Sequence, residues 1–368
     1  MTLSTASESR HQAHSSTVEE FPKPGTEADL CIVMYGGGVT SYETARRAIE
    51  TYGKENTEIW FADTRTEDRS LYKFNEEVER LLGLEIRIFS QGKDIWDIFY
   101  EQRALGNSRM DPCSKFLKRK PLRQALEERF NFSSCSECGD FYSNKPPTIY
   151  SLNLLGKRQN AHICETCLTT DSSYRLQHEQ YLEHQAQGDL GSHEVRTLVK
   201  KIGERIEPAD ADGKRVRVAL GMDDIEDCDR ILKARLYWRP FVPWFPLTED
   251  PIFKERIMQN LIEQGIEIPR LYEMGFKHNN CGGFCVKAGR GQFAHLYREL
   301  PSRFLKHEMR EQEFRDFIGA DVSILTETKD GRKTPLTLRR LRERMDSGED
   351  FPFKKNSSCS CLNPIEPD

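Results

Sequence analysis

The first part of the chain alternates short apolar runs with amphipathic segments. Residues 30–35 are continuously apolar, as expected for a strand of a parallel sheet that is buried on both faces. Residues 58–62 are predicted to form a second apolar strand and 85–89 a third strand, whereas 41–52 and 68–83 carry apolar residues at helical spacing. Strands that alternate with helices predict an α/β fold with a doubly wound, mostly parallel sheet.

The later part of the chain is predicted to complete this sheet and to add helices. Residues 215–221 are apolar at alternate positions and indicate a returning strand. Further helices are expected over 94–104, 114–130, 173–187, 253–264 and, in two pieces around Pro301, 292–318. Residues 1–28 are polar and are expected to be a disordered leader rather than a secretory signal. We also expect a mobile tail from about Glu349.

Three consecutive glycines, Gly36, Gly37 and Gly38, separate the first expected strand from a helix whose expected N-cap is Ser41. Glycine lets the backbone approach a ligand closely, and the N–H groups and dipole at a helix N-terminus favour an anion. Glycine triplets also occur in plain turns. Taken alone, this segment is therefore either a phosphate-binding loop or a turn.

Four of the eleven cysteines form two C-x-x-C pairs that 25 residues separate. They are Cys135, Cys138, Cys164 and Cys167. This spacing is typical of a tetrahedral zinc site with four thiolate ligands, and the segment between the pairs is expected to form a hairpin. Because protein atoms would supply all four ligands, the predicted zinc has a structural or docking role.

Residues 35–41, Tyr-Gly-Gly-Gly-Val-Thr-Ser, resemble the SGGKDS loop of the PAPS reductase and adenine nucleotide α-hydrolase (PP-loop) superfamily. PAPS is 3′-phosphoadenosine 5′-phosphosulfate. Three positions match the family: Gly37, Gly38 and Ser41. Three others depart from it, with Gly36 for serine, Val39 for lysine and Thr40 for aspartate. The departures remove a cation and a carboxylate, so the resemblance implies nucleotide binding more than ATP cleavage.

Four more segments are similar to this family and follow in the family's order. Residues 61–67 are similar to F-x-D-T-G-x-E, and 113–122 to a Cys-Cys…Lys…Pro-Leu segment in which Ser114 replaces the second cysteine. Residues 221–230 are similar to G-x-x-x-x-E…R, and 269–285 to a P-x-L-Y…N-C-x-x-C ending. The resemblance is to divergent members of the kind that phages and mobile elements carry.

The resemblance implies the site residues. The expected nucleotide-binding residues, for ATP or for PAPS or APS as a substrate, are Gly36, Gly37, Gly38, Thr40, Ser41, Asp63, Glu67, Lys118 and Arg230. The expected catalytic thiols are Cys113 and, delivered by the tail, Cys359 and Cys361. Three thiolates are candidates to hold a [4Fe–4S] cluster with one open iron: Cys113, Cys281 and Cys285. Alternatively, Cys228 or a tail cysteine adds a fourth ligand, or these residues are thiols without a metal.

Six segments follow from these patterns. They are a leader (1–28), the first half of a nucleotide-binding α/β domain (29–130), a zinc-ribbon insertion (131–171), a helical linker (172–212), the second half of the domain with its cysteine motif (213–320), and a C-terminal extension with the tail (321–368).

Composition and charge narrow the class of function. The net charge of −5 argues against a protein that coats nucleic acid nonspecifically. Local basic clusters remain, at 115–123 and 339–344, and are either a nucleic-acid-binding patch or solvated helix faces. No apolar stretch approaches the roughly 18 residues of a membrane span, so no membrane partner and a cytoplasmic location are expected.

Two hypotheses about function remain. The first is a sulfurtransferase or a reductase of phosphosulfate, with a sulfur donor or redox protein as partner and tRNA or DNA as a candidate substrate. The second is a non-catalytic module that senses a nucleotide and recruits a partner through the zinc ribbon.

Overall fold

The protein is described here from a computed structural model, in which the placed residues are 29–135, 140–143, 148–154, 157–162, 164, 167, 197–198, 213–222, 231, 234, 237–329 and 331–353. Several predictions lie outside these residues: the leader, the helix at 173–187, Cys138, Cys228, Arg230, Cys359 and Cys361.

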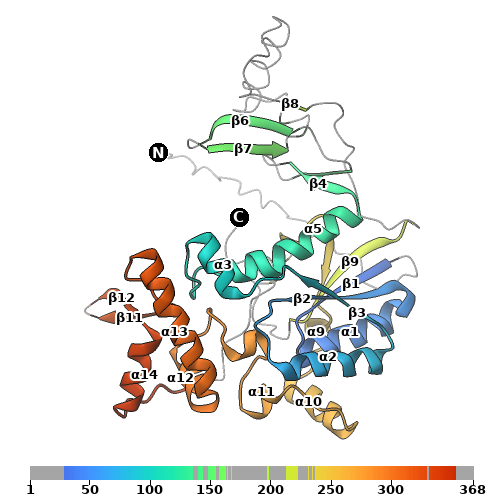
Figure 1. Ribbon diagram of the computed structural model, residues 1–368. Helices are drawn as coiled ribbons and strands as arrows, with labels where there is room; N and C mark the ends of the chain where they lie inside the picture. The colour runs from blue at the N-terminus through green and yellow to red at the C-terminus, as the bar shows by residue number, and fades with distance from the viewer. Residues whose placement is uncertain are drawn as a thin grey trace, which may run out of the picture.

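A five-stranded parallel sheet forms the centre of the fold (Figure 1). Its order is β10 (Val242–Trp244), β9 (Arg215–Leu220), β1 (Asp29–Tyr35), β2 (Thr57–Asp63) and β3 (Ile86–Ser90). The chain passes from β1 to β2 on one side and returns at β9 on the other. The predicted α/β fold with a mostly parallel sheet is confirmed.

Strand β1 explains why the sequence predicted this sheet. All seven of its residues are buried, and alternate side chains enter different cores. Val33 and Tyr35 pack into one core, whereas Ile32 and Met34 pack into the core on the opposite face. A strand covered on both faces needs apolar residues at every position, which is the pattern of residues 30–35.

Helices cover both faces of the sheet. Helices α1 (Val39–Tyr52), α2 (Arg69–Leu82) and α10 (Lys254–Glu263) contribute side chains to the core on one face. Helix α5 (Lys120–Arg129) contributes to the core on the other face through Leu122 and Leu126. The sheet is therefore doubly wound. Three short helical turns connect these elements: η1 (Lys54–Asn56), α9 (Pro246–Glu249) and α11 (Arg270–Glu273).

The C-terminal part packs into a third core beside the sheet. Helix α3 (Ile95–Gln102) joins α12 (Arg290–Glu299) and α13 (Pro301–Ile318) there. The sequence did not predict the elements that complete this core. They are the antiparallel hairpin of β11 (Leu325–Lys329) and β12 (Arg332–Leu336), and helix α14 (Leu338–Asp346).

The chain stays packed beyond the start of the expected tail. Phe351 is buried in the C-terminal core, and the ring of Phe353 stacks on His295. The prediction of a mobile tail from Glu349 is therefore wrong for residues 349–353, because the packed side chains of Phe351 and Phe353 anchor this segment. The rest of the tail lies outside the described residues.

A small antiparallel lobe occupies the segment between the two halves of the sheet. Strand β4 (Phe132–Ser134) pairs with β5 (Phe141–Ser143), and β6 (Thr148–Leu154) pairs with β7 (Lys157–His162) and with β8 (Thr197–Leu198). The β6–β7 pair is the hairpin expected between the two C-x-x-C pairs. In Figure 1 it lies apart from the parallel sheet, beyond α5.

The carboxylate of Glu311 holds the C-terminal elements together from inside their core. It accepts the backbone N–H groups of Ile324, at 3.0 Å, and of Leu338, at 2.6 Å. Burial raises the pKa of Glu311 to about 7, because desolvation outweighs these two hydrogen bonds. Glu311 is thus a buried group that titrates close to neutral pH.

We expect the Glu311→Gln variant to lose part of the pH dependence of stability. A folded-state pKa above the ordinary 4.5 means that the native state binds the proton more tightly than the unfolded state does. This contribution to stability is fully present below pH 4.5 and is lost as the pH rises through about 7. Urea unfolding at several pH values checks it: the difference between the two proteins should change across this window, and a constant difference would contradict the assignment.

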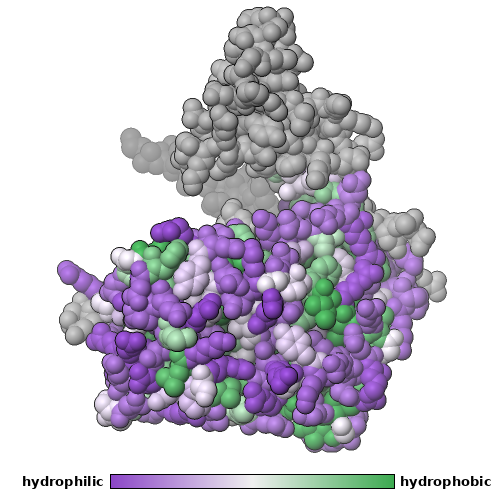
Figure 2. All heavy atoms as spheres, in the orientation of Figure 1, coloured by the Kyte–Doolittle hydropathy of each residue, from purple (hydrophilic) through white to green (hydrophobic). Residues whose placement is uncertain are grey.

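The surface is largely polar. In Figure 2, the described part of the face shows small apolar patches separated by hydrophilic residues. Large apolar side chains that are exposed include Ile88, Phe253, Ile262, Leu305 and Met309. None of the helices in the described ranges has the length and apolar character needed to cross a membrane.

Candidate functional site

Helix α1 begins directly after the three glycines and has no side-chain cap. Gly38 is its N-cap residue, no side chain bonds to the first turn, and that turn contains no acidic residue. The neighbouring helix α2 differs, since the side chain of Asp68 accepts the N–H of Ser70 at 3.0 Å. The N-terminal N–H groups of α1 therefore lack the capping side chain that normally satisfies them.

Ser41 has a different role from the predicted one. The helix starts two residues earlier, at Val39, and the Ser41 hydroxyl accepts the backbone N–H of Gly36 at 3.0 Å. The prediction that Ser41 is the N-cap is thus wrong. Its side chain bends back to close the glycine loop, so it fixes the loop's shape from within the first turn.

The glycines are required partly by packing inside the protein. Gly37 has φ = +78°, and a Cβ there would lie 2.6 Å from Cδ1 of Leu71. A Cβ at Gly38 would lie 2.7 Å from the hydroxyl of Tyr272. Both contacts are shorter than a real Cβ tolerates. Neither position accepts a larger residue without movement of its neighbour, whatever the loop binds.

The loop lies where ligands bind in open α/β sheets. It follows the carboxyl end of β1. Strand β2 lies on one side of β1 and strand β9 on the other, so the strand order reverses at β1. Gly221, which follows β9, packs against the start of α1: its Cβ position lies 3.0 Å from Thr44 Oγ1 and 3.5 Å from Ser41 Cα. Gly221, the first residue of the segment 221–230, thus lies beside the first turns of α1.

Asp63 also lies at this edge, at the end of β2. Its Oδ1 accepts the hydroxyl of Tyr72, at 2.7 Å, and the N–H of Arg65, at 2.9 Å. Burial, together with this hydrogen bond, raises the pKa of Tyr72 well above its ordinary value, which keeps the hydroxyl as a donor. Sequence reasoning missed Tyr72; its position nine residues after Asp63 carries no distinctive signal.

Glu67 lies inside the protein rather than at the surface of the loop. Its side chain is fully buried and accepts the Thr64 hydroxyl, at 3.0 Å, and the Lys118 ammonium, at 3.4 Å. It also accepts the backbone N–H of Cys281. Two predicted nucleotide-binding residues, Glu67 and Lys118, are thus paired with each other.

Lys118 lies on an irregular turn of an otherwise helical segment. The predicted helix over 114–130 is made of α4 (Pro112–Ser114), a π-helical turn η2 (Lys115–Arg119), and α5. Such π turns within helices are frequent at functional sites. The wider turn places Lys118 and Arg119 among buried groups.

The three cysteines that were predicted to act together line a single cavity. Its volume is about 10 Å³, which holds about one water molecule. Charged and thiol groups line it: Asp111, Cys113, Lys118, Cys281, Cys285 and Lys287. Sequence reasoning missed Asp111 and Lys287, which form an ion pair at 3.1 Å. An inorganic cluster does not fit a cavity of this size, so we derive no chemistry through one.

Cys281 has an unusual backbone conformation for its residue type. Its φ is +53°, and that of Gly282 is +58°. A left-handed conformation is uncommon for a residue with a Cβ and persists where surrounding contacts hold it. Here the carbonyl of Gly282 accepts a hydrogen bond from the Arg303 guanidinium of α13 at 2.6 Å. The N–H of Cys281 bonds to Glu67, so two distant parts of the chain hold the turn.

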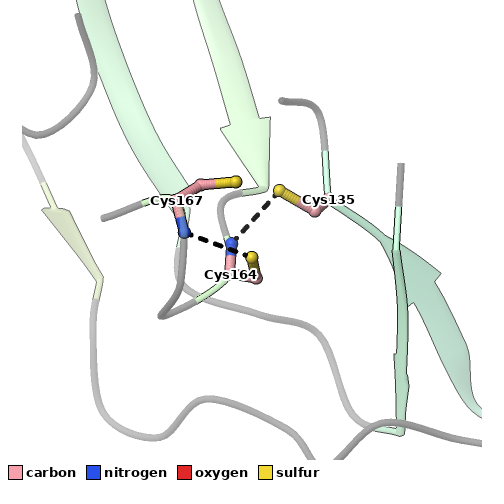
Figure 3. A group of neighbouring side chains, drawn as sticks. All are labelled: Cys135, Cys164 and Cys167. Carbon is pink, nitrogen blue, oxygen red and sulfur yellow. Dashed lines mark hydrogen bonds between the residues drawn. The ribbon is translucent and has the colours of Figure 1, made fainter. Parts of the chain in front are cut away.

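A second group of thiols lies in the small lobe. Cys135, Cys164 and Cys167 are buried, and their sulfur atoms all lie within 4.8 Å of one another (Figure 3). Backbone N–H groups point at two of the sulfurs: that of Cys164 at Cys135, 3.3 Å away, and that of Cys167 at Cys164, 3.5 Å away. Such N–H donors stabilise thiolates, and this group has the chemistry to hold a metal ion.

The basic clusters are largely neutralised by carboxylates. Glu308 pairs with Arg342 at 2.7 Å, and Glu327 with Arg344 at 2.6 Å. In the other cluster, Arg123 pairs with Glu127. These contacts favour the interpretation of both clusters as structural helix faces over a nucleic-acid-binding patch.

No family model matches the chain, and a search of curated proteins finds no significant match. The family resemblance therefore depends on the five ordered segments of the sequence alone.

Proposed function

We propose that this protein binds an adenine nucleotide through its phosphates at Gly36–Gly38 and the first turn of α1. The uncapped N-terminus of α1, placed at the switch point of the sheet, supports this proposal most directly. Backbone N–H groups and the helix dipole together favour a phosphate there. Because Val39 and Thr40 stand where the family has a cation and a carboxylate, binding is proposed and ATP cleavage is not.

The chemistry that we propose for this nucleotide is transfer of a sulfur group to a cysteine in the PAPS-reductase manner. The cysteine segment lies close to the loop, since Oδ1 of Asn280 is 4.0 Å from the Cβ position of Gly36. Attack of a Cys113 or Cys281 thiolate on the sulfur of PAPS would form the S–S bond of an S-sulfocysteine and break the S–O bond to the nucleotide, which leaves with the electron pair. Lys118 and Lys287, which line the cavity together with both thiols, would stabilise the attacking thiolate.

We further propose that the metal of the small lobe is zinc, with Cys138 as the fourth ligand of Cys135, Cys164 and Cys167. A tetrahedral site of four thiolates leaves no open position, so the zinc would hold the lobe together. The same lobe is the proposed docking site for a partner protein or a nucleic acid.

A charge placed in the first turn of α1 tests nucleotide binding without disrupting the fold. We expect Thr40→Glu to weaken binding of ATP and of PAPS by more than about tenfold. The family offsets its aspartate at this position with the preceding lysine, whereas Val39 leaves the repulsion between the new carboxylate and a phosphate uncompensated. The same charge should leave the stability of the helix unchanged or raise it by about 0.3–1 kcal/mol. Titration calorimetry measures the affinity, and thermal unfolding measures the stability.

Thr51→Glu is the matched control, because it adds the same side chain at the exposed far end of α1. It should leave nucleotide affinity unchanged. Equal affinities for wild type, Thr40→Glu and Thr51→Glu would show that the glycine loop is only a turn.

The alternative function is a nucleotide-sensing module without turnover, which the lost polar groups of the loop and the narrow cavity favour. Intact-mass measurement after incubation with PAPS separates the two. Gain of one sulfo group that Cys113→Ser or Cys281→Ser removes supports the enzyme. Nucleotide binding with no gain in mass supports the module.

A further inference from the structure

Glu67 and Asp68 are adjacent buried carboxylates that connect the nucleotide side of the site to the cysteine segment. Asp68 accepts Arg270, at 2.6 Å, and Arg303, at 2.8 Å. Glu67 accepts Lys118 and the N–H of Cys281. The two residues follow β2, so these adjacent positions hold groups from three distant parts of the chain: Lys118, the segment of Arg270 and Cys281, and Arg303.

The contacts of Glu67 reach the cavity from two directions. Lys118 and Cys281 both line that cavity, and Glu67 holds the ammonium of the first and the backbone of the second. The side chain of Glu67 is fully buried and that of Lys118 is 6% exposed. Water therefore screens their charges weakly, and each charge acts strongly on a neighbouring thiol.

We propose that Glu67 is a positioning residue that sets both the place and the electrostatic environment of the Cys281 thiol. Its carboxylate anchors the left-handed turn at Cys281 and partly neutralises Lys118, the cation that would stabilise a thiolate in the cavity. The proposal rests on the proposed function only in that the cavity is where a reactive thiol works. It differs from the sequence-based expectation, in which Glu67 contacts the nucleotide.

Opposite effects of the two charges make this proposal testable in the full-length protein. Glu67→Gln keeps the size and an oxygen acceptor but removes the negative charge, so the residue at position 67 no longer offsets the charge of Lys118 near the thiol. We expect iodoacetamide to alkylate Cys281 about tenfold faster. This change corresponds to a roughly tenfold larger population of the reactive thiolate. Lys118→Met, of similar length, should slow the same reaction.

The double variant distinguishes positioning from damage to the fold. In Glu67→Gln/Lys118→Met both buried charges are absent, and the rate at Cys281 should return to within about threefold of wild type. Loss of one partner of this buried pair would loosen the packing and speed alkylation in both single variants, whereas the proposed charge effects have opposite signs in the two. Peptide mass spectrometry measures Cys281 and Cys285 in the same sample, and Glu76→Gln, an exposed carboxylate of α2, is the control.

Unchanged alkylation of Cys281 in Glu67→Gln would overturn the proposal, as would equal acceleration at Cys281 and Cys285, or faster alkylation of Cys281 in Lys118→Met. The readout needs no nucleotide and no turnover. A protein that fails to bind ATP or PAPS but shows the compensating cycle would refute the proposed function and leave the role of Glu67 intact.

Discussion

Replacing both Cys135 and Cys164 by serine is expected to abolish binding of the proposed zinc and unfold the small lobe. Serine oxygen is a poor zinc ligand, and structural zinc sites supply about 10–16 kcal/mol of binding free energy in small domains. Strands β4 and β5, which lie next to Cys135 in the chain, have only three residues each. Apart from Phe132 and Phe141, the residues of the two cores of the parallel sheet lie outside the lobe, so the thermal transition of the sheet should persist.

Elemental analysis and limited proteolysis check this result. Wild type should carry one zinc per chain, and the double variant none, with new cleavage sites confined to the lobe. Cys285→Ser is the matched control, because it makes the same substitution at a thiol outside the metal group and should keep the zinc. A double variant with unchanged metal content would refute the site.

The second large effect is expected for Asp68→Ala, which should lower the free energy of unfolding by about 3–5 kcal/mol. The substitution removes the cap of α2 and leaves the charges of Arg270 and Arg303 without their carboxylate. Asp250→Ala provides a control, since Asp250 pairs with Arg47 but is 87% exposed, and exposed pairs contribute less than about 1 kcal/mol. Urea unfolding at pH 7 measures both.

Acid should weaken this contribution of Asp68. Burial opposes its ionisation, but hydrogen bonds from Arg270, Ser70 and Arg303 outweigh burial and hold its pKa well below the ordinary 3.8. A lowered folded-state pKa means that the stabilisation is present above pH 3.8 and is lost as the pH falls below it. The stability difference between wild type and Asp68→Asn should therefore shrink below pH 3.8; a difference that stays constant would show that the ion pairs contribute nothing.

The roles of single polar residues were hard to predict because they depend on distant partners. Ser41 was expected to cap a helix, and its hydroxyl instead accepts Gly36. Glu67 was expected at the nucleotide, and it pairs with Lys118, 51 positions away in the chain. Local propensity cannot decide between such bonds, since only folding brings the partners within reach.

The hairpin of β11 and β12 escaped prediction for a related reason. Its strands, Leu-Thr-Glu-Thr-Lys and Arg-Lys-Thr-Pro-Leu, carry no alternation of apolar and polar residues. Contacts made after the hairpin forms hold it in place: Leu325 and Leu336 enter the core, and the backbone just before β11 bonds to Glu311. The sequence pattern of residues 325–336 alone predicts a polar extension without regular structure.

The sequence by itself determined the class of the fold, the glycine loop between β1 and α1, and the cysteines to be considered for a metal. These properties depend on local spacing, such as the unbroken apolar run of a doubly covered strand or the two residues between paired cysteines. Only the tertiary structure decided that Cys113, Cys281 and Cys285 line one cavity. It also decided that Glu67 bonds to two residues of that lining. Those contacts join residues far apart in the chain, and their energies come from burial and charge pairing that exist only after the cores have packed.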